Sequence, residues 1–116
     1  TGIINMNNEM TTVAMQMILH AGDARTYIVE ALQNIKIFNF EVAKEKIAQA
    51  EKELIEAHQT QTKVLQEEAN GMKHELYVLF IHAQDTLMTI KSEYELARQL
   101  IEIFESIDER LKKVGV

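Results

Sequence analysis

A histidine, an aspartate and two threonines occur at helical spacing in the second half of this 116-residue chain. These residues are His82, Asp85, Thr86 and Thr89. Their positions, i, i+3, i+4 and i+7, would place all four along one side of a helix. The flanking segments 78–81 and 87–88 are apolar and favour burial. An unsatisfied polar group in such surroundings costs about 1–3 kcal/mol. The patch therefore indicates either an internal hydrogen-bond network or a site of chemical reaction.

The reaction that this patch can support is the transfer of a chemical group by way of the histidine side chain. A neutral imidazole can act as the nucleophile if a neighbour holds its second ring nitrogen and if donors receive the arriving anion. His82 is the best candidate, since Gln84, Asp85 and Thr86 follow within one turn. On residue types alone, a structural role for His82 stays equally open.

The other ionisable residues favour structural roles. His20 and His58 are expected to be satisfied structural histidines, and His74 a solvated residue near a helix start. Asp23 and Arg25 are expected to form ion pairs or caps rather than to act as catalysts.

Several catalytic classes lack their motifs. A di-iron bundle needs Glu-x-x-His pairs, but no glutamate stands three residues before any of the four histidines. The chain contains no His-Glu-x-x-His motif, no phosphate-binding glycine loop and no Gly-x-Ser-x-Gly motif. A metal-dependent hydrolase using His82 and Asp85 would need a third ligand that the sequence does not place nearby.

Composition narrows the class of protein further. Twelve basic and 18 acidic residues give a net charge of −6, which argues against nucleic-acid binding. The absence of cysteine excludes disulfides and thiolate catalysis and fits a reducing compartment. No apolar run approaches the roughly 18–20 residues of a membrane span. We therefore expect a cytoplasmic protein without direct membrane insertion.

The chain also lacks proline and is 47% hydrophobic, which predicts an all-α fold. Helical periodicity predicts three long helices, over about 8–36, 40–69 and 73–111. Asn39 is the expected N-cap of the second helix, and Asn70-Gly71 its left-handed stop. Short connections predict an antiparallel up-down-up bundle. Residues 1–7 are expected to be a cloning remnant or a disordered start, and residues 8–116 a single domain.

Each predicted helix carries an inward apolar stripe. The first stripe is Met10, Val13, Ala14, Met17, Ala21, Ala24, Ile28, Ala31, Leu32 and Ile35. The second is Ala43, Ile47, Ala50, Leu54, Ala57, Gln61 and Leu65. The third is Leu76, Phe80, Ala83, Leu87, Ile90, Tyr94, Ala97, Ile101 and Phe104.

The third helix has a second apolar stripe, formed by Val78, Ile81 and Met88, with Asp85 at the same spacing. A helix that is apolar on two sides is buried on two sides, so we expect self-association through this helix. Copies of Asp85 would then meet near the symmetry axis and would bind a cation or take up protons. The alternative, that Asp85 simply faces solvent, is equally open from spacing alone.

Three segments together resemble one known family. They are His82-Ala83-Gln84-Asp85 with Leu87-Met88-Thr89, Ala21-Gly22-Asp23-Ala24-Arg25, and Glu56-Ala57-His58 with Gln61-Thr62. In this order and spacing they resemble the IIA component of lactose/cellobiose-type sugar phosphotransferase systems, from about Met10 to the end of the chain.

The resemblance implies a homotrimer of three-helix subunits, a nine-helix cylinder with the third helices around its axis. It implies that His82 accepts a phosphoryl group from the phosphocarrier HPr and passes it to a cysteine of the cognate IIB component, which serves a membrane IIC component. It also implies that Asp85 and its symmetry copies hold a structural divalent cation such as Mg²⁺, and that Gln84 lies close to the phosphoryl group.

One position departs from the family pattern. Members commonly carry a second histidine where this chain has Thr86, which offers only a neutral hydroxyl and is given at most a weak stabilising role. The resemblance therefore predicts a phosphotransferase component, for uptake of a β-linked disaccharide. Ala83 and the segment 61–63 favour cellobiose or chitobiose over lactose. The alternative is a helical interaction or regulatory module without phosphotransfer.

Overall fold

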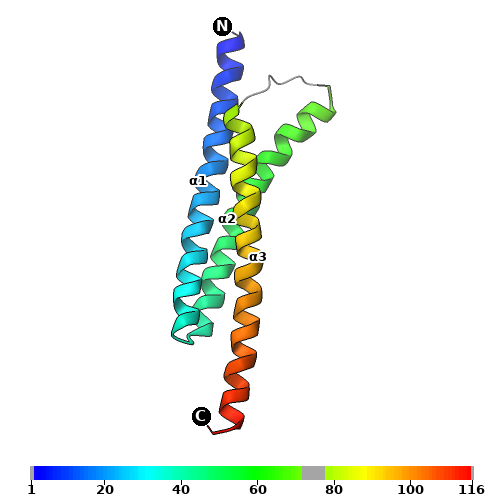
Figure 1. Cartoon of the computed structure of the whole chain (residues 1–116). Coiled ribbons are helices and arrows are strands. Elements are labelled where there is room, and N and C mark those ends of the chain that lie inside the picture. The colour runs from blue at the N-terminus through cyan, green and yellow to red at the C-terminus, as the bar shows by residue number, and fades with distance from the viewer. Residues whose placement is uncertain (1, 72–77, 116) are drawn as a thin grey trace.

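In the computed structural model the chain forms three long α-helices (Figure 1). The structure describes residues 2–71 and 78–115, and the side chains from residue 9 onward within these ranges. The helices are α1 (Gly2–Lys36), α2 (Phe40–Ala69) and α3 (Val78–Lys113). α1 and α3 run in the same direction and α2 runs against them (Figure 1). Since the described ranges contain no strand, the predicted all-α, up-down-up bundle is confirmed.

The ends of α2 follow the expected local chemistry. The Asn39 side chain accepts a hydrogen bond of 3.4 Å from the backbone N–H of Val42, as an N-cap should. After Ala69 the chain turns at Gly71, whose φ of +92° lies in the left-handed region that glycine adopts without a Cβ clash.

The start of α1 differs from the prediction. α1 begins at Gly2, six residues before the predicted start near Asn8. The assignment of residues 1–7 as a cloning remnant or a disordered start stays a prediction. The predicted start of the third helix near Lys73, the inward position of Leu76 and the setting of His74 lie outside the described residues.

The core is built mainly of alanine with larger side chains interleaved. Its buried members on α2 and α3 are Ala43, Ile47, Ala50, Leu54, Ala57, Val64, Phe80, Ala83, Leu87, Ile90, Ala97 and Ile101. On α1 they are Met10, Ala14, Met17, Ala21, Ala24, Ile28, Ala31 and Ile35. Val13, Leu32, Tyr94 and Phe104 pack against this core while partly buried.

The predicted inward stripe of α2 is wrong near its end, where Leu65 was expected in the core. Val64 is buried there, whereas Leu65 is 47% exposed. Val64 lies seven residues after Ala57, so it continues the stripe with two whole turns, while position 65 has rotated away from it.

The second stripe of α3 points away from the core, as predicted. Val78 is 76% exposed, Ile81 39% and Met88 57%, and Asp85 is also exposed. No described helix is long and apolar enough to cross a membrane. Figure 1 also shows that the last turns of α2 diverge from the other two helices, so α3 is less covered on its α2 side near its beginning.

Candidate functional site

His82 lies on the surface of α3, near the beginning of the described part of that helix. The core contains no buried polar or charged residue among those described, so the polar patch around His82 is a surface feature and not an internal network. Within the described part of the chain, the imidazole of His82 forms no hydrogen bond or ion pair. Both ring nitrogens are therefore without a partner among the residues that the structure describes.

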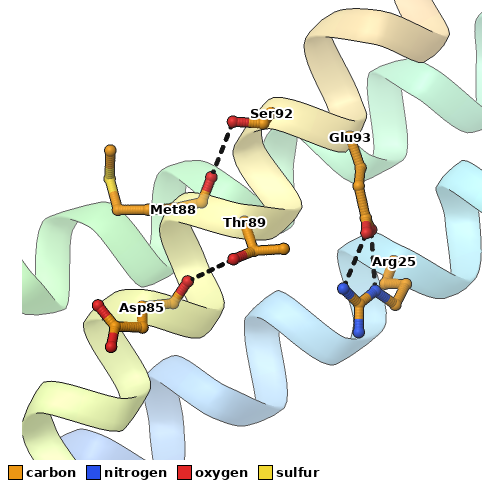
Figure 2. Close-up of polar contacts among 6 residues, drawn as sticks. All are labelled: Arg25, Asp85, Met88, Thr89, Ser92 and Glu93. Atoms are coloured by element: carbon orange, nitrogen blue, oxygen red, sulfur yellow. Dashed lines mark hydrogen bonds and ion pairs between the residues drawn. The ribbon is translucent and has the colours of Figure 1, made fainter.

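The side of α3 that carries His82 can be fixed from an ion pair further along the helix. Arg25 of α1 donates two hydrogen bonds to Glu93 of α3, from Nε to Oε1 at 2.9 Å and from Nη2 to Oε2 at 2.8 Å (Figure 2). Glu93 therefore faces α1. His82 stands eleven residues earlier, which is close to three whole turns. The imidazole thus lies on the edge of α3 that borders α1.

Thr86 lies one turn after His82 and is half-buried. Its hydroxyl donates a 2.9 Å hydrogen bond to the backbone carbonyl of His82. The hydroxyl proton is thus engaged with the helix itself, and Thr86 keeps only oxygen lone pairs for other contacts. Its expected weak role in stabilising an anion has no free donor in this arrangement.

The same kind of bond recurs twice along α3. Thr89 donates to the carbonyl of Asp85 at 2.9 Å, and Ser92 to that of Met88 at 3.2 Å (Figure 2). Neither hydroxyl is therefore aimed at His82.

Gln84 occupies a different edge of α3. A separation of two residues rotates a helical side chain by about 200°, so Gln84 and His82 point to nearly opposite sides. Gln84 lies eleven residues before Glu95, which lines a groove between α3 and α2. Within one chain, Gln84 is therefore poorly placed to act on a group carried by the His82 ring.

Asp85 points outward between the edge of α3 that carries His82 and the edge that carries Gln84. It lies in the centre of the exposed stripe of α3. Figure 2 shows its carboxylate and the Met88 side chain turned away from the Arg25–Glu93 pair. Asp85 has no ion-pair partner among the described residues, and no three metal-binding side chains of those residues lie together. A cation held at Asp85 would need ligands from other molecules.

The remaining histidines differ in whether they form a side-chain contact. His20 of α1 forms a 2.7 Å contact through Nδ1 with Glu53 of α2, so it is structural as expected. His58 is exposed and forms no hydrogen bond in the described part of the chain, which corrects the expectation of a satisfied histidine. Ala57, the preceding residue, is fully buried, so the helical rotation of one position turns His58 out of the core to the rim of the α2/α3 groove.

Two open grooves border α3, each with a volume of about 440 Å³. The α2/α3 groove has Leu54 and Leu87 in its wall and Tyr94 beside it. Tyr94 donates a 3.2 Å hydrogen bond to Glu51, and burial, followed by the charge of Glu51, raises the pKa of its phenol. The α1/α3 groove begins at the Arg25–Glu93 pair and is lined by Val29 and Leu96.

Sequence analysis did not identify the partners of His20 and Arg25, which are Glu53 and Glu93. These partners lie 33 and 68 residues away in the sequence, and no local sequence pattern indicates a contact over such a separation. Arg25 itself was expected to form an ion pair, which is confirmed.

Comparison with known proteins agrees with this fold. Residues 12–105 match the model of the family described as "PTS system, Lactose/Cellobiose specific IIA subunit". The chain belongs to this family of phosphotransferase components.

The lichenan-specific phosphotransferase enzyme IIA component of Bacillus subtilis is 40% identical over 105 residues, which cover 90% of this chain and 96% of that protein. The N,N'-diacetylchitobiose-specific EIIA component of Escherichia coli is 36% identical over 99 residues, 85% of each chain.

Solved structures show the same arrangement. The crystal structure of the cellobiose-specific enzyme IIA from Bacillus anthracis is similar with a TM-score of 0.81 and 38% identity, over 86% of this chain and 92% of that one. The IIA(Chitobiose) chain of the Escherichia coli IIA(Chitobiose)–HPr complex is similar with a TM-score of 0.75 and 34% identity, over 85% of this chain and 96% of that one.

Proposed function

We propose that this chain is a cytoplasmic phosphocarrier that accepts a phosphoryl group on His82 from HPr and passes it to a cysteine of its cognate IIB component. The observation that carries the proposal is the exposed, unbonded imidazole of His82 on α3 of a lactose/cellobiose-type IIA subunit. The similar IIA protein of Escherichia coli has been solved in complex with HPr, which supports the choice of donor.

The proposed transfer of the phosphoryl group requires an unprotonated nitrogen on the imidazole of His82. A neutral His82 nitrogen attacks the phosphorus in line, a nitrogen–phosphorus bond forms, and the bond between phosphorus and the donor protein breaks. In the second step a cysteine thiolate of IIB attacks the same phosphorus, and the bond to His82 breaks. The hydroxyls of Thr86 and Thr89 donate to backbone carbonyls, so neither of them supplies a proton donor to the phosphoryl group.

We further propose that the chain works as a homotrimer closed by the exposed stripe of α3. Val78, Ile81 and Met88 give that stripe apolar side chains that one subunit leaves uncovered. In a cyclic trimer the two edges of neighbouring α3 helices face each other, so Gln84 of one subunit would approach His82 of the next. This arrangement gives Gln84 the supporting role that it cannot fill within one chain.

Asp85 fits a metal site on the trimer axis. Its carboxylate is exposed, lacks an ion-pair partner among the described residues and is surrounded by the apolar stripe. A divalent cation such as Mg²⁺, which prefers oxygen ligands, would offset the mutual repulsion of three such carboxylates. In this proposal the ion stabilises the assembly and takes no part in the transfer.

The transported sugar is proposed to be a β-linked disaccharide of the cellobiose or chitobiose type. The names of similar proteins include lichenan-, lactose- and chitobiose-specific components, which supports the β-glycoside class without selecting one member. The membrane IIC component would complete the pathway of the sugar.

Phosphorus NMR of the protein incubated with enzyme I, HPr and phosphoenolpyruvate tests the proposal. We expect a phosphohistidine signal that disappears in His82→Gln and persists in His20→Gln and His58→Gln. A wild-type protein that folds and binds HPr but never acquires the signal would instead be a regulatory interaction module.

A further inference from the structure

His58 is a basic side chain that the proposed transfer does not use. It is exposed on α2, lines the α2/α3 groove, and forms no hydrogen bond or ion pair in the described part of the chain. The positions three and four residues before and after it carry no carboxylate, so no acidic side chain within one turn of α2 neutralises a protonated imidazole. Among the described residues that line the groove, the carboxylate contributed by α2 is that of Glu51, which accepts the hydrogen bond of Tyr94.

The other charged side chains of the groove come from α3. Glu95 forms an ion pair with Arg98 at 3.2 Å. Lys91 is exposed and has no ion-pair partner among the described residues. Of the described residues, α1 contributes none to the lining of this groove. With Glu95 offset by Arg98, Lys91 and a protonated His58 outnumber the Glu51 carboxylate, so the groove favours an anion.

The hydrogen bond between Tyr94 and Glu51 fixes the level of His58 along α3. His58 stands seven residues after Glu51, which is close to two whole turns of α2. Because α2 runs against α3, His58 lies at about the level of Leu87, seven residues before Tyr94, and Leu87 also lines the groove. Gln84 stands less than one turn from Leu87. His58 and Gln84 therefore belong to the same short region on the α2 side of α3.

The proposed trimer brings this region to the phosphorylation site of the neighbouring subunit. In that assembly Gln84 of one subunit approaches His82 of the next, so the groove side chains at the level of Gln84 approach the same His82. Within one chain the two imidazoles are kept apart, because His82 lies on the α1 edge of α3 and His58 lies in the groove on the α2 edge. A meeting of the two histidines therefore requires two subunits.

A phosphoryl group on His82 brings negative charge to an edge of α3 that offers it little compensation. The hydroxyl of Thr86 donates to a backbone carbonyl, and Arg25, the cation that α1 presents to this edge, is bound to Glu93. A cation from the neighbouring subunit would lower the free energy of the phosphoryl dianion.

We propose that a protonated His58 of the neighbouring subunit pairs with the phosphoryl group carried by His82 and stabilises the phosphorylated state. The inference rests on the proposed function, including its trimer, and assigns a second imidazole to the same site. His58 forms no covalent bond and neither gains nor loses a proton in the transfer. Its contribution is the electrostatic attraction between imidazolium and phosphoryl oxygens.

The equilibrium constant of phosphoryl transfer from HPr, measured against pH, tests the proposal. An imidazole is protonated at the acidic end of the range of about pH 5–8 and neutral at the other end. At about pH 5.5 the wild type should therefore favour the phosphorylated form about tenfold more than His58→Gln, the effect of a unit charge about 6 Å from a dianion in a medium close to water. This difference should disappear above about pH 8. His58→Arg should keep the favourable equilibrium throughout, because its guanidinium stays charged.

Lys63→Gln is the matched control, because it removes a positive charge from an exposed position of α2 that lies about 140° round the helix from His58. Its equilibrium constant should equal that of the wild type at every pH. An equal loss in Lys63→Gln and His58→Gln would overturn the proposal, as would a His58→Gln protein indistinguishable from the wild type.

Mixed trimers identify the subunit that supplies the imidazole. In trimers assembled from equal amounts of His82→Gln and His58→Gln subunits, only the His58→Gln subunits carry an acceptor, and about half of these acceptors neighbour an intact His58. About half of the acceptors should therefore recover the wild-type equilibrium at low pH. If none recovered it, His58 would act within its own subunit or through the fold, and the proposal would be wrong.

Failure of this inference can be told from failure of the proposed function. A wild-type protein that HPr never phosphorylates, or that stays monomeric, would contradict the proposed function and the inference with it. A trimeric wild type that is phosphorylated on His82, with an equilibrium that does not depend on His58, would contradict the inference alone.

Discussion

Arg25 and Glu93 join α1 to α3 by two parallel hydrogen bonds of 2.9 and 2.8 Å, which fixes the edge of α3 that faces α1. The hydrogen bond to Glu93 raises the pKa of the guanidinium, which is charged in any case. Both side chains remain well exposed, at 48% and 38%, so water and salt screen the pair.

We therefore expect only a modest stabilising contribution from this pair. A double-mutant cycle with Arg25→Met and Glu93→Gln should give a coupling free energy of about 0.2–1 kcal/mol, measured by chemical denaturation at fixed protein concentration. The coupling should shrink in 1 M salt. A coupling of several kcal/mol that salt does not affect would contradict this assignment of an exposed pair.

Thr86 should matter little for the transfer itself. Its hydroxyl proton is donated to the His82 carbonyl, so Thr86→Val removes a local helix contact but no donor to the phosphoryl group. We expect the rate of phosphorylation by HPr to change by less than about threefold, a difference below 1 kcal/mol.

The complementary substitution adds a group that the family commonly carries at this position. In Thr86→His a protonated imidazole would stand one turn from His82 and could interact with the phosphoryl dianion. We expect the hydrolysis rate of phosphorylated His82 to become pH-dependent between about pH 5 and 8 in this variant. Identical pH profiles of hydrolysis for Thr86→His and the wild type would contradict the expectation.

Asp85→Leu should uncouple assembly from divalent cations. In the proposed trimer the substitution would replace three mutually repelling carboxylates by apolar side chains that match Val78, Ile81 and Met88. Sedimentation velocity with and without EDTA should show a cation-dependent trimer for the wild type and a cation-independent trimer for Asp85→Leu. A variant trimer that still requires the ion would place the metal elsewhere.

Tyr94 provides a test at alkaline pH. Its phenol has a pKa raised above the ordinary value of 10.0, because burial disfavours the phenolate and the Glu51 carboxylate repels it. Above pH 10 the unfolded state loses this proton before the folded state does. The stability of the fold therefore falls as pH rises from about 10 through the raised pKa.

Absorbance titration of the wild type against Tyr94→Phe isolates this phenol. We expect Glu51→Gln to lower the pKa of Tyr94 part of the way towards 10.0, since burial remains. An ionisation of Tyr94 at or below pH 10 in the wild type would contradict the structural assignment.

The helices could be predicted because their signals are local. The absence of proline, the period of the apolar residues, the Asn39 cap and the Gly71 stop are all readable within a few positions. The burial of Val64 in place of Leu65 was missed because the predicted stripe advanced by four residues twice, from Ala57 to Gln61 and on to Leu65. Eight residues exceed two whole turns, so Leu65 lies outside the stripe, whereas Val64, seven residues after Ala57, lies within it.

The candidate site could be predicted only in part. The spacing of His82 and Asp85 gave their placement on α3, but it did not show that His82 borders α1, since that follows from the distant contact of Arg25 with Glu93. Gln84 was placed near the phosphoryl group by the family resemblance, and helical rotation puts it on a different edge of α3 from His82 of the same chain. His58 is exposed because it stands one position after the buried Ala57, outside the apolar stripe of α2.

The divergence of the last turns of α2 from the other helices has a consequence for spectroscopy. One subunit measures 70 × 22 × 18 Å, so as a monomer it tumbles end over end more slowly than it spins about its long axis. Amide bond vectors of α1 and α3 point nearly along that axis, whereas those of the diverging turns of α2 are inclined to it (Figure 1). Nitrogen-15 relaxation rates of those turns should therefore differ from the rest even if they are equally rigid, and the angle of divergence can be measured in solution.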